Sequence, residues 1–178
     1  SVQFTEAAAS PSRAGMLPPL DTTFSSPVYG YSIRIPSPPG WSADPAATAA
    51  ADGPIDFGSA VDSIYEPQTT SEFLVWANDL HGQTFDAWLA AINQSPVGIG
   101  PLAGCNREDP ETWATVPVGS GQGRLMPMCD PNAAVVHVPV DQRVFTFVMG
   151  YEKSRGYLTI DAFKALLTTV TFGAPGDR

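Results

Sequence analysis

The side chains that could act as nucleophiles, bases or metal ligands are few and poorly spaced. The chain has two histidines, His81 and His137, and no Gly-x-Ser-x-Gly turn that would present a serine nucleophile. His81 could ligate a metal together with Asp79 or Asp86, but one histidine near carboxylates is a far weaker signal than paired histidines. We interpret His81 as a solvated loop residue. The sequence therefore predicts no catalytic residue, no metal site and no cofactor, and we do not expect an enzyme.

Three further motifs are better explained by structure than by chemistry. His137 lies within VVHVPV on the face opposite Val136 and Val138, a pattern that we interpret as a solvated strand face. The acidic stretch NREDPE at 106–111 lacks the ligand spacing of a calcium loop, which favours a solvated loop. The glycine-rich GSGQG at 119–123 lacks the Lys-Ser/Thr pair of a phosphate-binding loop and leads into a strand. It therefore predicts a hairpin turn.

Aromatic side chains provide the remaining binding signal. Rings supply apolar area with a polar edge, as clefts for small molecules require. Tyr65 and Trp76 are the candidate cleft-lining residues, and a ligand held by them would be apolar or amphipathic. Trp41 and Trp88 are assigned to the core, because one follows the first strand pair and the other lies on the apolar stripe of a helix.

The net charge excludes some classes of partner. The chain of 178 residues carries 9 Lys+Arg against 18 Asp+Glu, which gives a formal charge of -9 and a pI near 4.4. Such a chain repels phosphate backbones and anionic lipid surfaces, and its scattered cations form no cluster in the sequence. We therefore expect no nucleic-acid partner.

Export is expected from the cysteines and from the start of the chain. The sequence begins at Ser1 rather than Met, which indicates a processed or trimmed product, and no apolar run within 1–178 is long enough to span a bilayer. Cys105 and Cys129 lie either side of a hairpin-like stretch, so a disulfide is the economical interpretation. Two buried free thiols in a cytosolic protein are the alternative. The predicted location is extracytoplasmic, either secreted or anchored to the outer face of the membrane.

The first 21 residues have the composition of an arm or linker. They are rich in Ala, Ser and Pro and lack apolar periodicity. Four apolar residues of this arm could contact a partner: Val2, Phe4, Met16 and Leu17. The arm could equally lie along its own domain. Docking on a partner protein of a membrane or surface complex, or self-association, is the first hypothesis for function, and a small-ligand binding module is the alternative.

Hydrophobic periodicity predicts one α+β domain, in which an antiparallel sheet is flanked by two main helices. Apolar spacing indicates helices at 84–93 and 159–168, with Thr84 and Thr159 as N-caps. Four successive strands between 113 and 149 are expected to form an antiparallel meander. The expected strands are 22–26, 31–36, 60–65, 72–77, 113–118, 124–129, 133–138, 143–149 and 169–172.

Several of these segments, taken in order, resemble a known family. The segments are YGYSIRIPSPPGW, FLVWA followed by TFDAWLAAI, a cysteine before a tryptophan-containing strand, FTFVMG and FKALLTTVTF. Together they are similar to the PsbP/Mog1-like domains of exported, often lipoprotein-anchored proteins of actinobacteria and related bacteria. The resemblance covers residues 22–172, between the arm at 1–21 and a tail at 173–178. It implies a non-enzymatic accessory or binding role in an extracytoplasmic setting.

Overall fold

The structure is a computed structural model. It describes residues 17–36, 41–47, 61–66, 71–94, 109–126, 128, 133–149 and 158–173.

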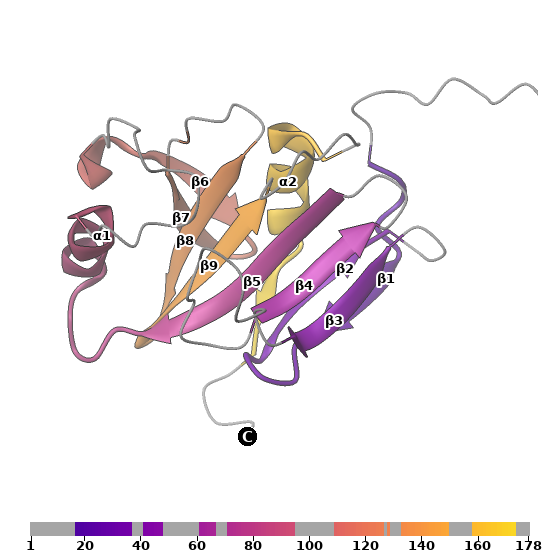
Figure 1. The fold of residues 1–178 in the computed structure, drawn as a ribbon, viewed down its shortest axis with the longest axis horizontal. Helices are drawn as coiled ribbons and strands as arrows, with labels where there is room; N and C mark the ends of the chain where they lie inside the picture. The colour runs from indigo at the N-terminus through magenta and orange to yellow at the C-terminus, as the bar shows by residue number, and fades with distance from the viewer. Residues whose placement is uncertain are drawn as a thin grey trace, which may run out of the picture.

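The centre of the molecule is an antiparallel sheet of seven strands, which we call the main sheet, in the order β3-β4-β5-β9-β8-β7-β6 (Figure 1). Strands β6 to β9 form a continuous meander, as the sequence predicted. β8 and β9 lie near the centre and bury side chains on both faces, as strands covered on both sides do. The strands are β3 Ser42–Ala47, β4 Val61–Glu66, β5 Ser71–Asp79, β6 Ala114–Val118, β7 Gly121–Met126, β8 Ala134–Val140 and β9 Arg143–Met149.

A small sheet of three strands packs against one face of the main sheet. It consists of β1 Thr22–Ser25, β2 Tyr31–Ile35 and β10 Thr171–Phe172, in the order β1-β2-β10. The Tyr31 ring meets Phe145 and Phe147 of β9 edge-on, with centroids 6.1 Å and 6.0 Å away. We call this covered side of the main sheet the inner face, and the opposite side the outer face.

Helix α2 completes the inner side. It spans Ile160–Leu167 and begins where Thr159 Oγ1 accepts a hydrogen bond from Ala162 N at 3.1 Å, which confirms the predicted cap. Its Phe163 ring packs against Phe73 of β5 at 6.2 Å. Because α2 buries Ala162, Phe163, Leu166 and Leu167, it is a core element.

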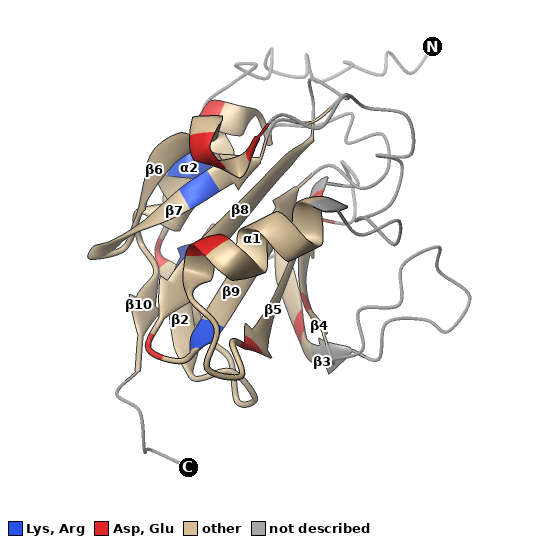
Figure 2. Cartoon of the chain, turned by 90° about the vertical axis from the view of Figure 1, so that its left-hand side faces the viewer, with Lys and Arg blue, Asp and Glu red and all other residues tan. Residues whose placement is uncertain are grey.

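Helix α1 lies on the outer face of the main sheet and buries fewer side chains than α2 does. It spans Phe85–Gln94, and Thr84 Oγ1 accepts a hydrogen bond from Ala87 N at 3.2 Å, so this cap is also confirmed. Leu89 is buried, whereas Phe85 and Trp88 are half-buried. Figure 2 shows α1 lying across the main sheet in front of β8 and β9.

The predicted fold class, an antiparallel sheet flanked by two main α-helices, is wrong. The structure is mostly β, with sheets of seven and three strands, and helices of only 10 and 8 residues. The physical reason is that β10 pairs with β2 and thereby makes a second sheet, which covers part of the face that the helices were expected to cover. Among the described residues, no helix is long and apolar enough to cross a membrane.

Candidate functional site

A row of side chains crosses the outer face of the main sheet in direct register. Thr115 pairs with Arg124, Arg124 with His137, His137 with Thr146, and Thr146 with Trp76. Directly opposed residues of antiparallel strands point to the same face, with Cβ atoms about 5 Å apart. The row therefore brings a guanidinium, an imidazole, a hydroxyl and an indole together from β7, β8, β9 and β5. We call it the polar row.

His137 is the most unusual member of the polar row because it is buried. Its side chain is 1% exposed, and its Nδ1 lies 3.0 Å from Thr146 Oγ1. Within the described part of the chain, its Nε2 has no hydrogen-bond partner. Burial lowers the pKa of the imidazole to about 3, so the ring is neutral at physiological pH. The interpretation of His137 as a residue of a solvated strand face is wrong.

Two tryptophans enclose the imidazole. The Trp88 ring of α1 meets His137 at 5.2 Å in an edge arrangement, and the Trp113 ring stacks on it at 6.1 Å with an interplanar angle of 27°. Trp113 is positioned by the 3-10 helix η2, Pro110–Thr112, whose cap Asp109 accepts a hydrogen bond from Glu111 N. The imidazole of His137 is therefore covered by the residue that follows η2 and by α1.

Arg124 supplies the one positive charge of the polar row. Its Nη1 donates to Trp113 O and to Thr115 Oγ1, both at 3.3 Å. Across the described ranges, no carboxylate forms an ion pair with Arg124. The guanidinium is thus fixed through one nitrogen, while its other N–H groups are not used by the described residues.

This arrangement can bind but is poorly suited to acid-base chemistry. Thr146 Oγ1 and His137 Nδ1 have the spacing of a nucleophile and its base, yet both side chains are 1% exposed in the middle of strands. A base whose pKa lies near 3 is a weak proton acceptor at neutral pH. Hydrogen bonding to a buried polar group is the chemistry that remains.

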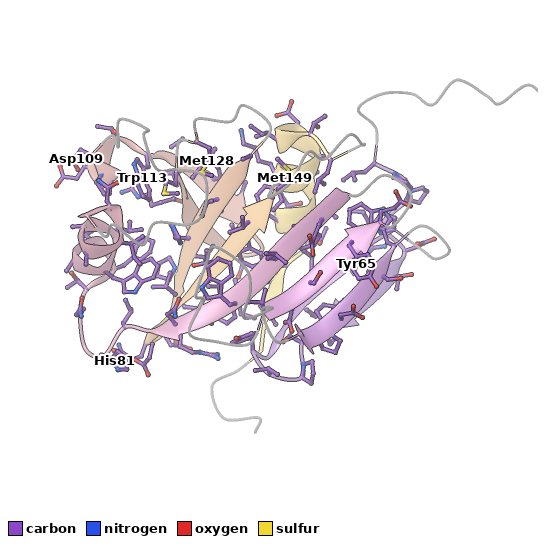
Figure 3. All side chains as sticks on the ribbon, viewed as in Figure 1. Tyr65, His81, Asp109, Trp113, Met128 and Met149 are labelled. Atoms are coloured by element: carbon purple, nitrogen blue, oxygen red, sulfur yellow. The ribbon has the colours of Figure 1, made fainter. Side chains whose placement is uncertain are left out.

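The predicted ligand residues Tyr65 and Trp76 lie apart on the main sheet. Both belong to the outer face, but Tyr65 is paired with Glu72, which lies four residues before Trp76 on β5, a distance of about 13 Å along the strand. Trp76 is 5% exposed, its Nε1 donates to Asn78 Oδ1 at 3.0 Å, and it lies at the end of the polar row. Figure 3 shows Tyr65 and Trp113 at opposite ends of the molecule.

Tyr65 instead belongs to an acidic patch on β3, β4 and β5. Ser63 donates to Glu72 Oε1 at 2.5 Å, and Asp44 is directly paired with Ser63. The Asp44 carboxylate, helped by Glu72, raises the pKa of the Tyr65 phenol. This patch is a surface of negative charge, distinct from the polar row.

A second buried polar group lies on the inner face and is structural. Asp62 is 0% exposed and lies near the Tyr31 hydroxyl. Burial, followed by the Asp62 carboxylate, raises the pKa of Tyr31 far above its ordinary value. The small sheet and the aromatic core enclose this pair, so it is part of the packing between the sheets.

The remaining predicted site residues are mostly outside the described residues. These are Val2, Phe4 and Met16 of the predicted partner contact, and both cysteines of the predicted disulfide, Cys105 and Cys129. Leu17 is described, and it is half-buried against the core of its own domain, as is Leu20.

His81 lies in the exposed turn before α1. Its Nδ1 lies 3.8 Å from Asp79 Oδ1, and its backbone N–H donates to the same oxygen at 2.7 Å. The described part of the chain contains no group of three or more His, Cys, Asp or Glu side chains that could hold a metal ion. His81 and Asp79 therefore form a turn contact.

Comparisons with known proteins add a likeness of fold. No family model matches the chain, and no curated protein matches its sequence. A crystal structure of a protein from Bacteroides thetaiotaomicron VPI-5482 is similar over 88% of this chain, with a TM-score of 0.51 and 14% sequence identity. The match covers 50% of that protein, so this chain spans about half of its length. The resemblance to PsbP/Mog1-like domains stays a prediction.

Proposed function

We propose that this chain is a non-enzymatic extracytoplasmic binding domain that takes a small amphipathic molecule at the α1 end of the outer face. The observation that supports this proposal is His137 Nε2, a buried nitrogen without a hydrogen-bond partner among the described residues, enclosed by Trp88 and Trp113. Leaving such a group unsatisfied costs about 1 to 3 kcal/mol. A ligand that supplies the missing partner recovers this free energy when it binds.

The attachment of α1 offers a route to the buried nitrogen. Phe85 and Trp88 are only half-buried, whereas α2 on the inner face buries Phe163, Leu166 and Leu167 fully. Elements with few buried apolar side chains open at low free-energy cost without global unfolding. Movement of α1 would therefore expose His137 while the sheets stay folded.

Native mass spectrometry of the freshly isolated protein tests this proposal. We expect an additional mass on the wild-type protein that is lost in Trp88→Ala, because the indole is one wall of the site. Tyr65→Ala is the matched control, since it removes an aromatic ring from the same sheet face far from the polar row (Figure 3). A wild-type protein without added mass, or a mass retained by Trp88→Ala, would contradict the proposal.

Docking on a partner protein through the arm is the second candidate. Leu17 and Leu20 pack against the domain's own core, so the arm's contact with a partner would depend on residues before Leu17. A deletion of residues 1–16 should therefore remove the partner contact and leave stability unchanged. Co-purification that survives this deletion would count against the arm.

A further inference from the structure

The hydrogen-bonding state of His137 can be assigned by counting donors and acceptors. Thr146 Oγ1 has His137 Nδ1 as its hydrogen-bond partner, 3.0 Å away. If the ring proton were on Nδ1, it would donate to Oγ1 and leave both the threonine O–H and the Nε2 lone pair unsatisfied. If the proton is on Nε2, the threonine O–H donates to Nδ1, and only the Nε2–H lacks a partner among the described residues. The second tautomer leaves fewer unsatisfied groups, so Nε2 is a donor.

A second set of unused donors belongs to the neighbouring strand β7. Arg124 is the direct cross-strand neighbour of His137, and its Nη1 is occupied by Trp113 O and Thr115 Oγ1. The Nη2 and Nε groups form no hydrogen bond with any described residue, and no acid of the described part pairs with the charge. An arginine held through one nitrogen presents the others in a fixed fork.

We propose, on the basis of the binding function above, that the ligand carries a carboxylate held jointly by the Arg124 guanidinium and the Nε2–H of His137. A carboxylate has the acceptor oxygens that both donors require, and it matches the planar guanidinium. Its single negative charge is balanced by the single positive charge of the polar row. A doubly charged phosphate would keep an unbalanced charge beside a buried neutral ring, which favours the carboxylate.

The tryptophans define the rest of the ligand. Trp113 stacks on His137 and its carbonyl oxygen holds Arg124, so an apolar wall adjoins both donors. Trp88 of α1 adds a second indole, which meets the same imidazole edge-on. Once α1 has moved, a flat apolar body bearing one carboxylate would contact the indoles with its body and reach the donors with its oxygens.

Ligand titrations followed by NMR test the inference. His81→Gln leaves His137 as the single imidazole of the chain, so its resonance is assigned directly. The probes are benzoate, 3-phenylpropionate and acetate, each compared with its neutral amide, together with inorganic phosphate. We expect the aromatic carboxylates to shift the His137 and tryptophan indole signals, and the amides to bind about 10- to 100-fold more weakly.

Variants separate this inference from the proposed function. Arg124→Met should weaken the carboxylates by about 10- to 100-fold and the neutral amides much less, because only the carboxylates lose an opposite charge, and Arg124→Lys should restore part of the affinity. Arg34→Met, on the exposed face of the small sheet, is the control for net charge. If acids and amides bind with equal affinity and Trp88→Ala abolishes binding of both, the preference for a carboxylate is overturned and the proposed binding function is kept. No shift with any organic probe, or a buried water on Nε2 in a crystal structure, would overturn both.

Discussion

The two faces of the main sheet bury side chains of different chemistry. The inner face is aromatic and apolar, with Tyr31, Phe145 and Phe147 packed edge-on and Phe73 against Phe163. The outer face buries Thr146 and His137 at its centre, beneath α1 and η2. The same strands β5, β8 and β9 supply both faces, because alternate residues of a strand point in opposite directions.

The two faces stabilise the fold by different kinds of interaction. Apolar burial on the inner face stabilises the fold without regard to orientation. A buried polar group contributes only when its partner is present, and costs free energy when the partner is missing. We therefore expect mutations and pH changes at the polar row to affect both binding and the free energy of unfolding, through hydrogen bonds and protonation, whereas inner-face mutations affect the free energy of unfolding alone.

Acidification should produce the largest effect, through His137. Burial lowers the pKa of this imidazole from 6.5 to about 3 in the folded protein. Between these values the unfolded chain binds a proton that the folded chain excludes, so the stability contributed by this group is complete above pH 6.5 and is lost as the pH falls toward 3. The full shift corresponds to about 5 kcal/mol.

Denaturant unfolding between about pH 4 and pH 7 measures this contribution. The wild-type free energy of unfolding should fall more steeply with acid than that of His137→Phe, which cannot titrate at this position. NMR titration of the single imidazole in His81→Gln gives the pKa directly. Parallel pH profiles for wild type and His137→Phe would show that the imidazole is not excluded from protonation.

Phe163→Ala should give the next largest effect, on the inner side. The ring is 0% exposed between α2 and Phe73, and its loss should cost about 3 to 5 kcal/mol in the free energy of unfolding. Phe85→Ala is the matched variant in α1, where the ring is half-buried, so its cost should be clearly smaller. Equal costs in chemical denaturation would mean that α1 belongs to the core as much as α2 does.

Local sequence signals predicted the elements better than their assembly. Thr84 and Thr159 are confirmed as helix caps, and each end of both helices lies within one residue of its predicted position. These predictions succeeded because capping and apolar spacing act over only one or two turns of helix. The β6 to β9 meander was also predicted, because each strand and each turn between them has a signal in neighbouring residues. The pairing of Thr171 with Ser32 joins residues far apart in the chain, and no local pattern encodes it.

The sequence did not indicate the site because His137 was expected on a strand with only one buried face. Polar residues that alternate with valines normally face solvent, so VVHVPV suggested a solvated histidine. In the structure, Ala134 through Val138 are all buried, since β8 is near the middle of a sheet covered on both sides. Trp88 and Trp113 provide that cover from elements distant in sequence, and their contact with His137 has no signature in the sequence.

Thr146→Val should have a moderate effect, which tests the assigned tautomer. The substitution keeps the shape of the side chain but removes the hydroxyl that contacts His137 Nδ1, and it should cost about 1 to 3 kcal/mol. Thr146→Ser keeps the hydroxyl and should cost less. Nitrogen-15 shifts of the wild-type imidazole should show the proton on Nε2. A proton found on Nδ1 would reverse the donor assignment, and with it the expected acceptor on the ligand.

Removal of the helix caps should give the smallest effects and the finest comparison of the two sides. Thr84→Ala and Thr159→Ala each remove a side-chain acceptor from the first turn of a helix, with an expected cost of about 1 kcal/mol. In α2 this cost should appear in global unfolding, because four of its eight residues are buried in the core. In α1, which is attached mainly through Leu89 and half-buried rings, the cost should appear as faster local opening.

Hydrogen exchange of the α1 amides should therefore rise about fivefold in Thr84→Ala and stay unchanged in Thr159→Ala. Because α1 covers His137, the Thr84→Ala protein should also bind and release aromatic carboxylates faster. Exchange that rises equally throughout the protein in both variants would show that α1 opens only with the whole domain, and access to the polar row would then need another route.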